Sequence, residues 1–275
     1  MNTPLIENTV QLKADISGTG TPILLLHGFP DSRKMWQSIT PYFTTNNYQV
    51  IAPDMRGFGD SPMPEKKKDY KVDLIVADLV ELLQTNNITQ PIYVMGHDWG
   101  AVIAWCFALA HPELVERLVV LSVGHPKAYA WAGREQKIKG MYVLGFQFSG
   151  LAEYVLSKNN FRSLRQWGKQ HPDIEESIQN MSRPGRLTAG LNYYRSNLVS
   201  AFTNPWPNCT IPVLGVLGAN DSLLAEDQMK DSEKYMDAEW EYVRLDNVGH
   251  WISLEQPKEL YTLVHDWFGK ELSNV

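Results

Sequence analysis

Short apolar runs, each closed by a turn residue, recur along the chain. Five runs are followed by glycine, proline or a nearby aspartate, residues that interrupt regular structure. Because these runs do not alternate with polar residues, they are typical of strands buried on both faces, as in a parallel sheet covered by helices. The predicted strands lie at residues 23–26, 50–52, 92–95, 118–123 and 213–218.

Helical patterns lie between these runs. Asp73 is expected to cap a helix that ends at Asn86 and Asn87. Residues 101–109 are apolar nearly all round, which predicts a buried helix, and residues 259–268 predict a last amphipathic helix. Strands that alternate with helices predict an α/β fold with a mostly parallel, doubly wound sheet.

The stretch at residues 127–207 breaks this rhythm. It is rich in aromatic residues at helical spacing and contains no strand-like run. We therefore predict a helical cap domain at residues 127–207, inserted into an α/β core formed by residues 1–126 and 208–275. Most of the aromatic side chains are expected to form the core of the insertion, because aromatic residues usually bury.

The amino-acid composition argues against several classes of function. The net charge is −6 and there is no long basic cluster, which argues against binding of nucleic acid through a broad basic surface. Two cysteines form no disulfide framework, the N-terminus lacks a signal-peptide pattern, and the longest apolar run is too short to span a bilayer. The histidines and cysteines show no close pairing of the kind that binds zinc. We expect a cytoplasmic protein without a metal or a membrane attachment, either a monomer or a homodimer.

The segment Gly96-His97-Asp98-Trp99-Gly100 lies between a predicted strand and the predicted buried helix. Small residues around a central nucleophile are typical of the nucleophile elbow, a strained turn from strand to helix. The central residue here is Asp98, whose carboxylate can attack carbon and form an ester. The alternative role for Asp98 is that it only caps the helix.

Hydrolysis of an aspartyl ester needs a base and a group that orients the base. In the chain order typical of such elbows, an acid follows a later strand and a histidine comes last. Asp221 follows the run at 213–218, and His250 precedes the last helix. We therefore predict a catalytic triad of Asp98, Asp221 and His250, and structural roles for the other six histidines.

Backbone amides are expected to stabilise the oxyanion that forms as the ester breaks. In elbows of this kind the donors come from the residue after the nucleophile and from the loop after the first core strand. These amides belong to Trp99 and Phe29. A further glycine-containing stretch, residues 54–61, is interpreted as structural, with Gly57 and Gly59 as turn residues.

With these motifs in place, the sequence closely resembles the α/β-hydrolase superfamily and, within it, the epoxide hydrolases. The resemblance rests on His-Gly-Phe-Pro at 27–30, Gly-His-Asp-Trp-Gly at 96–100 and Gly-His-Trp at 249–251, and it extends over nearly the whole chain. It implies a hydrolase that converts a small-molecule epoxide to a vicinal diol through a covalent aspartyl ester, without a cofactor.

The resemblance also implies two lid tyrosines that donate hydrogen bonds to the epoxide oxygen. Leu-Asn-Tyr-Tyr-Arg at 191–195 is similar to the lid segment of the family, in which the tyrosine before the arginine is the donor, here Tyr194. The second tyrosine lies a few residues before a Phe-Gln pair, which maps it to Tyr142, with Tyr129 and Tyr154 as nearby alternatives. Phenols with a pKa near 10 can hold or protonate the alkoxide.

Two other functions stay open. Aspartate nucleophiles in this superfamily also displace halide, so a dehalogenase is the first alternative, with Trp99 as a candidate halide donor. Haloalkane dehalogenases typically have Asn where Phe29 stands, and fluoroacetate dehalogenases have Arg in place of Trp99. Both positions therefore favour an epoxide hydrolase over a dehalogenase. The second alternative is a non-catalytic protein that binds a small ligand or a protein partner in the same cavity, because fold alone does not establish function.

Overall fold

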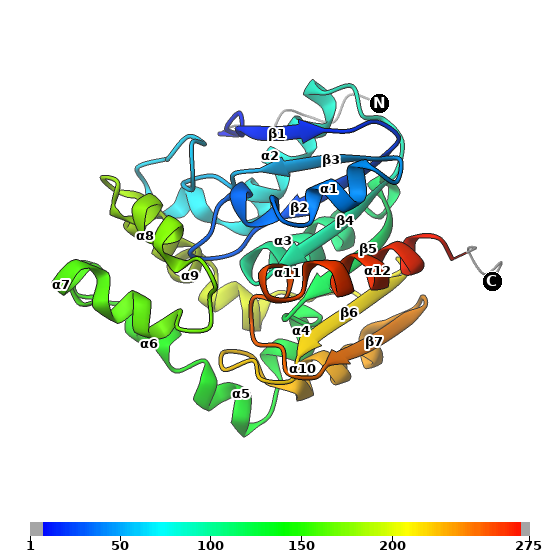
Figure 1. The fold of residues 1–275 in the computed structure, drawn as a ribbon. Helices are drawn as coiled ribbons and strands as arrows, with labels where there is room; N and C mark the ends of the chain where they lie inside the picture. The colour runs from blue at the N-terminus through cyan, green and yellow to red at the C-terminus, as the bar shows by residue number, and fades with distance from the viewer. Residues whose placement is uncertain (1–7, 271–275) are drawn as a thin grey trace.

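A seven-stranded sheet forms the centre of the protein in the computed structural model, which describes residues 8–270 (Figure 1). The strands are β1 Ala14–Ser17, β2 Thr21–Leu26, β3 Tyr48–Pro53, β4 Ile92–His97, β5 Val115–Leu121, β6 Val213–Gly218 and β7 Trp240–Leu245. Their order is β1-β3-β2-β4-β5-β6-β7, with β1 antiparallel to β3 and every other neighbouring pair parallel. The predicted α/β fold with a mostly parallel sheet is therefore confirmed.

The two edge strands, β1 and β7, are the strands that the hydrophobic pattern misses. Every residue of β1 is at least partly exposed, and β7 buries only its last residue, Leu245. The interior strand β6, in contrast, buries every residue. Because an edge strand has a neighbour on one side only, its sequence carries no continuous apolar run.

Helices cover both faces of the sheet and divide its apolar side chains into two cores (Figure 1). The α-helices outside residues 126–203 are α1 Thr40–Thr44, α2 Val72–Thr85, α3 Trp99–Ala110, α10 Glu226–Lys230, α11 Ile252–Glu255 and α12 Pro257–Phe268. Along β2, Leu24 and Leu26 point to the core formed with α2 and α3, whereas Ile23 and Leu25 point to the core formed with α1 and α12. Alternation along each strand thus supplies both cores.

The start of α2 corrects the expectation that Asp73 is its N-cap. The helix begins at Val72 after an extended Lys71, and Asp73 lies in its first turn, where a negative charge suits the helix dipole. The amide of Val72 donates instead to the side chain of Asn197, at 2.9 Å. The free amide at the start of this helix therefore finds its hydrogen-bond acceptor 125 residues away along the chain. A local sequence pattern cannot reveal such a partner.

The segment between β5 and β6 is helical, as its spacing predicts, and we call residues 126–203 the lid segment (Figure 1). Its helices are α4 Pro126–Ala130, α5 Arg134–Lys139, α6 Tyr142–Phe146, α7 Leu151–Trp167, α8 Ile174–Ser182 and α9 Arg186–Thr203. The helical path of α7 is broken at Lys158, Asn159, Asn160 and Phe161. A division of the chain into separate core and cap domains stays a prediction. Within residues 8–270, no helix has both the length and the apolar character required to cross a bilayer.

The start of α3 passes unusually close to β2. A Cβ atom on Gly100 would lie 1.9 Å from the carbonyl oxygen of Leu26, and one on Gly96 would lie 2.3 Å from the carbonyl oxygen of Gly100. Both obstacles are backbone atoms, which cannot rotate away as a side chain can. The close approach of the elbow to the sheet therefore depends on glycine at both positions.

We predict that Gly100→Ala lowers the free energy of unfolding by about 3 kcal/mol, because the added methyl group must displace backbone. Gly145→Ala in α6 is the matched control, since a Cβ there meets nothing within 4 Å, and we expect it to be neutral or slightly stabilising. Urea unfolding followed by circular dichroism measures both. Equal stability of the two variants would contradict the close approach.

Candidate active site

Asp98 occupies a strained turn between β4 and α3. Its backbone has φ 52° and ψ −120°, a region that costs a non-glycine residue about 1–3 kcal/mol. The side chain makes no capping hydrogen bond to α3, so the capping alternative lacks its defining contact. Gly28 lies directly against the turn, where a Cβ atom would stand 2.5 Å from the Asp98 carboxylate. The turn thus directs the carboxylate away from the helix and toward the loop after β2.

The loop after β2 supplies one of the two expected oxyanion donors to this carboxylate. The Phe29 amide donates to Asp98 Oδ1 at 2.9 Å. His27 holds the loop, since its Nε2 accepts from the Met55 amide at 3.0 Å while its Nδ1 faces the Gly28 carbonyl oxygen at 2.9 Å. Trp99 is the first residue of α3, where amides have no partner within the helix. Within residues 8–270 its amide makes no hydrogen bond to Asp98.

His250 and Asp221 lie together beside Asp98. The Nδ1 atom of His250 is 2.7 Å from Asp221 Oδ2, and its Nε2 atom is 3.7 Å from Asp98 Oδ2. The amides of Leu223 and Leu224 donate to the other oxygen of Asp221 at 2.8 and 2.9 Å, which orients the carboxylate. The structure thus brings all three predicted triad residues together, with His250 between two carboxylates.

Burial and neighbouring charges shift the pKa of the His250 imidazole in opposite directions. Burial alone lowers the pKa of His250, but Asp221 and then Asp98 outweigh it and raise the pKa to about 10. Burial raises the pKa of Asp221, yet His250 and the two amides hold that pKa below its usual value. Because the folded pKa of His250 exceeds 6.5, its charge stabilises the fold below about pH 6.5, and that contribution is lost as the pH rises through 10.

The rings of the two predicted lid tyrosines pack edge to face against each other. The ring centroids of Tyr142 and Tyr194 are 6.2 Å apart, and Tyr194 is also 5.1 Å from Trp99 and 5.8 Å from Phe29. Burial raises the pKa of both phenols well above 10. The Tyr194 hydroxyl is buried without a hydrogen-bond partner among residues 8–270, which is unusual for a buried polar atom.

One cavity of about 680 Å³ lies between the nucleophile and the lid tyrosines. It is lined by Asp98, Trp99, Tyr142 and Tyr194, and also by Tyr129 from α4. The third candidate, Tyr154, does not line the cavity and exposes 58% of its surface. The geometry therefore excludes Tyr154 and favours Tyr142, whose ring packs beside Tyr194, over Tyr129. Its role as the second hydrogen-bond donor stays a prediction.

Arg195 joins the helices that carry the two phenols, a contact that the sequence pattern did not identify. Its Nε donates to the Phe146 carbonyl oxygen at 2.7 Å, and its two terminal nitrogens donate to the two carboxylate oxygens of Glu153 at 2.7 and 2.9 Å. Tyr142 begins α6 and Phe146 ends it, while Tyr194 precedes Arg195 in α9. The guanidinium group thus fixes α6 against α9 and α7.

Asp31 ties the lid segment to the base. One of its oxygens accepts from Ser177 Oγ at 2.7 Å and pairs with His171 Nε2 at 2.8 Å, and the other accepts from Trp251 Nε1 at 3.0 Å. Burial raises the pKa of Asp31, but His171 and these hydrogen bonds outweigh it and hold that pKa below its usual range. Trp251 follows His250 and packs edge-on against its ring. The structural role expected for His171 is therefore a contact between lid and core.

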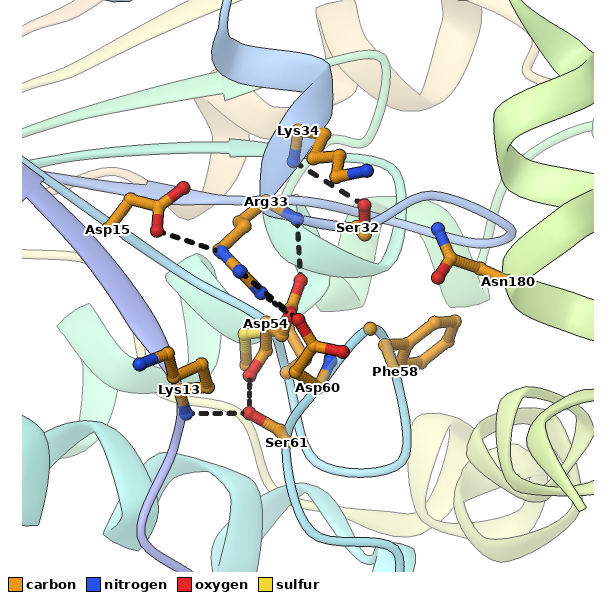
Figure 2. Close-up of polar contacts among 12 residues, drawn as sticks. Lys13, Asp15, Ser32, Arg33, Lys34, Asp54, Phe58, Asp60, Ser61 and Asn180 are labelled. Carbon is orange, nitrogen blue, oxygen red and sulfur yellow. Dashed lines mark hydrogen bonds and ion pairs between the residues drawn. The ribbon is translucent and has the colours of Figure 1, made fainter. Parts of the chain in front are cut away.

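The stretch at residues 54–61 forms a polar turn beside the lid, consistent with its structural interpretation. Figure 2 shows Arg33 among the carboxylates of Asp15, Asp54 and Asp60. The amides of Arg33 and Asp60 donate to Asp54 at 2.8 and 2.7 Å. Gly57 and Gly59 have φ values of 84° and 46°, as turn glycines do.

Comparison with known proteins agrees with this geometry. A family model described as "alpha/beta hydrolase fold" matches residues 21–257. The chain is 31% identical to "Epoxide hydrolase 3" of Xenopus tropicalis, over 90% of this chain and 71% of that protein. It is 30% identical to "Epoxide hydrolase 2" of Siraitia grosvenorii, over 98% of both chains.

A solved structure supports the same relationship. It is that of a mutant epoxide hydrolase from Bacillus megaterium complexed with its product, a naphthyloxy-propanediol, with a TM-score of 0.85 and 25% identity. The match covers 95% of this chain and 98% of the other. From the fold, the matching family model and these relatives, it follows that the chain belongs to the epoxide hydrolase family of α/β-hydrolases.

Proposed function

We propose that this protein hydrolyses epoxides to vicinal diols through a covalent ester on Asp98. The observation that carries the proposal is the arrangement of three kinds of group around Asp98. Its carboxylate, on a strained turn, lines one cavity together with two neutral phenols. An imidazole paired with a second carboxylate lies 3.7 Å from the Asp98 carboxylate. A cytoplasmic location, a separate cap domain and a small-molecule epoxide as the only reaction partner besides water belong to the same proposal.

In the first step, a carboxylate oxygen of Asp98 attacks a carbon of the epoxide ring, and the bond from that carbon to the ring oxygen breaks. The ring oxygen becomes an alkoxide, which receives a proton from Tyr142 or Tyr194. The high pKa of the buried phenols keeps both protonated at neutral pH, so both can donate. The unpartnered Tyr194 hydroxyl supports this role, because the substrate oxygen supplies its missing acceptor.

Ester formation changes the charge that His250 experiences. Asp98 loses its negative charge when it becomes an ester, and that charge is one of the causes that raise the pKa of His250 to about 10. The pKa therefore falls in the ester, so the imidazole can release its proton to the tyrosinate that the first step leaves behind. The neutral imidazole can then act as a base.

In the second step, His250 takes a proton from a water molecule that attacks the carbonyl carbon of the ester. The Phe29 amide, at 2.9 Å from Asp98 Oδ1 in the free protein, is placed to stabilise the oxyanion, with the Trp99 amide as the second expected donor. Collapse of the oxyanion breaks the bond between the ester carbonyl carbon and the diol oxygen. The proton of the newly formed Asp98 carboxyl group moves to that oxygen, which releases the diol and restores the Asp98 carboxylate. His250 keeps the proton that it took from water and so returns to its protonated state in the free protein.

We predict that a single turnover in ¹⁸O-labelled water gives a diol without label, because its new oxygen comes from Asp98. Excess enzyme is mixed with epoxide, and mass spectrometry of the diol and of the peptide that contains Asp98 locates the label. Label in the diol of the first turnover would contradict attack by Asp98. Halide release from a chlorinated analogue, measured alongside, would indicate a dehalogenase instead.

We predict that Tyr142→Phe and Tyr194→Phe each slow ester formation by about 10²-fold, as expected for loss of a general acid. Tyr129→Phe is the matched control, since it removes a third phenol from the same cavity. Rapid quenching and mass measurement of the esterified protein give the rate. A large loss with Tyr129→Phe and a small one with Tyr142→Phe would reverse the assignment of the second donor.

We predict that Asp98→Ala lowers the pKa of His250 from about 10, because it removes one of the two facing carboxylates. Asp221→Asn should lower it further, because Asp221 is the larger cause. Imidazole ¹⁵N chemical shifts followed against pH report both values. A titration that Asp98→Ala leaves unchanged would show that the nucleophile does not control the base.

A further inference from the structure

Charge is divided unequally between the lid segment and the rest of the chain. The lid segment contains eleven Lys and Arg residues and five Asp and Glu residues, a net charge of +6. Since the whole chain has a net charge of −6, the remainder has −12. The electrostatic field of the lid therefore attracts anions, whereas that of the core repels them.

Exposed apolar side chains gather in the same segment. Within residues 8–270, ten of the twelve exposed large hydrophobic residues lie in the lid segment. The largest exposed fraction, 77%, belongs to Trp131. Apolar side chains concentrated in one exposed region mark an interaction surface more often than scattered ones do. The ten are Trp131, Ile138, Met141, Leu144, Phe148, Leu151, Tyr154, Val155, Val199 and Phe202.

This apolar set is continuous with the active-site cavity. Met141, Leu144, Val199 and Phe202 are exposed and also line the cavity that contains Asp98. Figure 1 shows α5, α6 and α7 following one another along the side of the molecule remote from the sheet. The exposed apolar residues therefore extend from the rim of the cavity along these helices. We call the ten exposed apolar residues, together with the exposed basic residues between them, the lid face.

Basic side chains are interspersed with these apolar residues. Arg134, Lys137, Arg162 and Lys169 are exposed and form no ion pair within residues 8–270. Lys137 also lines the cavity. An exposed tryptophan among apolar and unpaired basic residues is the composition of surfaces that lie in the headgroup region of anionic membranes.

A second copy of the chain fits this face less well. Two lid segments, each with a net charge of +6, repel each other when they meet. Contact between the lid of one copy and the acidic core of the next would match the charges but not the apolar residues. Within residues 8–270, only Ile16 and Met63 are exposed large hydrophobic residues outside the lid segment. An anionic lipid surface satisfies both the charge and the apolar residues without either difficulty.

In place of the expectation from the sequence that the protein has no membrane attachment, we propose that the lid face docks on an anionic lipid surface. The rim of the cavity then lies at the membrane boundary. Apolar side chains enter the headgroup region while the basic side chains contact lipid phosphates. The docking step is independent of catalysis. Delivery of a hydrophobic epoxide from the lipid into the cavity is its consequence, and that part rests on the proposed function.

The experiment compares binding of the whole protein to vesicles of phosphatidylglycerol and of phosphatidylcholine by flotation. We expect binding to the anionic vesicles, at least tenfold weaker binding to the neutral ones, and loss of binding when salt is raised from about 50 mM to about 500 mM, because salt screens surface charge. Asp98→Ala should bind equally well. A protein that binds vesicles but forms no diol would contradict the proposed function alone.

Matched variants locate the surface. Phe148→Ser with Leu151→Ser, and Arg134→Glu with Arg162→Glu, should each reduce binding to anionic vesicles about tenfold while leaving turnover of a water-soluble epoxide unchanged. The controls make the same kinds of change on the exposed surface of the core, with Ile16→Ser for the apolar pair and Lys68→Glu for the basic pair. Neither control should alter binding.

Three results would overturn the proposal: no binding to phosphatidylglycerol, equal binding to both lipids, or equal losses in lid and core variants. The oligomeric state, measured by light scattering, gives a fourth result that would overturn the proposal. A dimer that Phe148→Ser dissociates would show that a second copy covers the lid face.

Discussion

Two carboxylates share one imidazole at the centre of this protein, and the rest of the site is arranged around that balance of charge. His250 has Asp221 on one nitrogen and Asp98 near the other, and all three side chains are buried. Burial alone lowers the pKa of His250, so the charge of the imidazole is held in this buried site by the two carboxylates beside it. In the proposed reaction, esterification of Asp98 removes one charge from the group, so the geometry that holds a protonated imidazole in the free protein produces a base for the next step.

The lid segment is joined to this centre by buried polar contacts as well as by packing. Asp31 receives hydrogen bonds from the lid and from Trp251, the neighbour of His250, and Arg195 links the helices that present the two phenols. Buried polar groups tolerate little displacement, because each broken contact leaves an unsatisfied atom away from water. The nucleophile, the base and the phenols are therefore held in one arrangement although they come from distant parts of the chain.

The lid also has an outer surface whose chemistry differs from that of the core. Its inner side presents neutral phenols to the nucleophile, whereas its outer side combines positive charge with exposed apolar residues. In the proposed arrangement the same helices contact the epoxide on one side and lipid on the other. The acidic core, repelled by an anionic surface, would then favour an orientation with the lid toward the membrane.

The sequence by itself determined the central strands, the buried helix α3, the elbow around Asp98 and the candidate triad. These signals are local, or follow a fixed chain order: continuous apolar runs, glycines two residues from Asp98, and an acid and a histidine after later strands. The hydrophobic pattern did not predict the edge strands β1 and β7, because half-exposed strands lack continuous apolar runs. Three contacts were decided only by the tertiary structure. The Asn197 side chain accepts a hydrogen bond from the first amide of α2, 125 residues away. His171 pairs with Asp31 across 140 residues, and Arg195 pairs with Glu153 across 42 residues. Side chains so far apart meet only when the lid packs on the sheet, and nothing in their spacing distinguishes them from the many residues of the same types that do not pair.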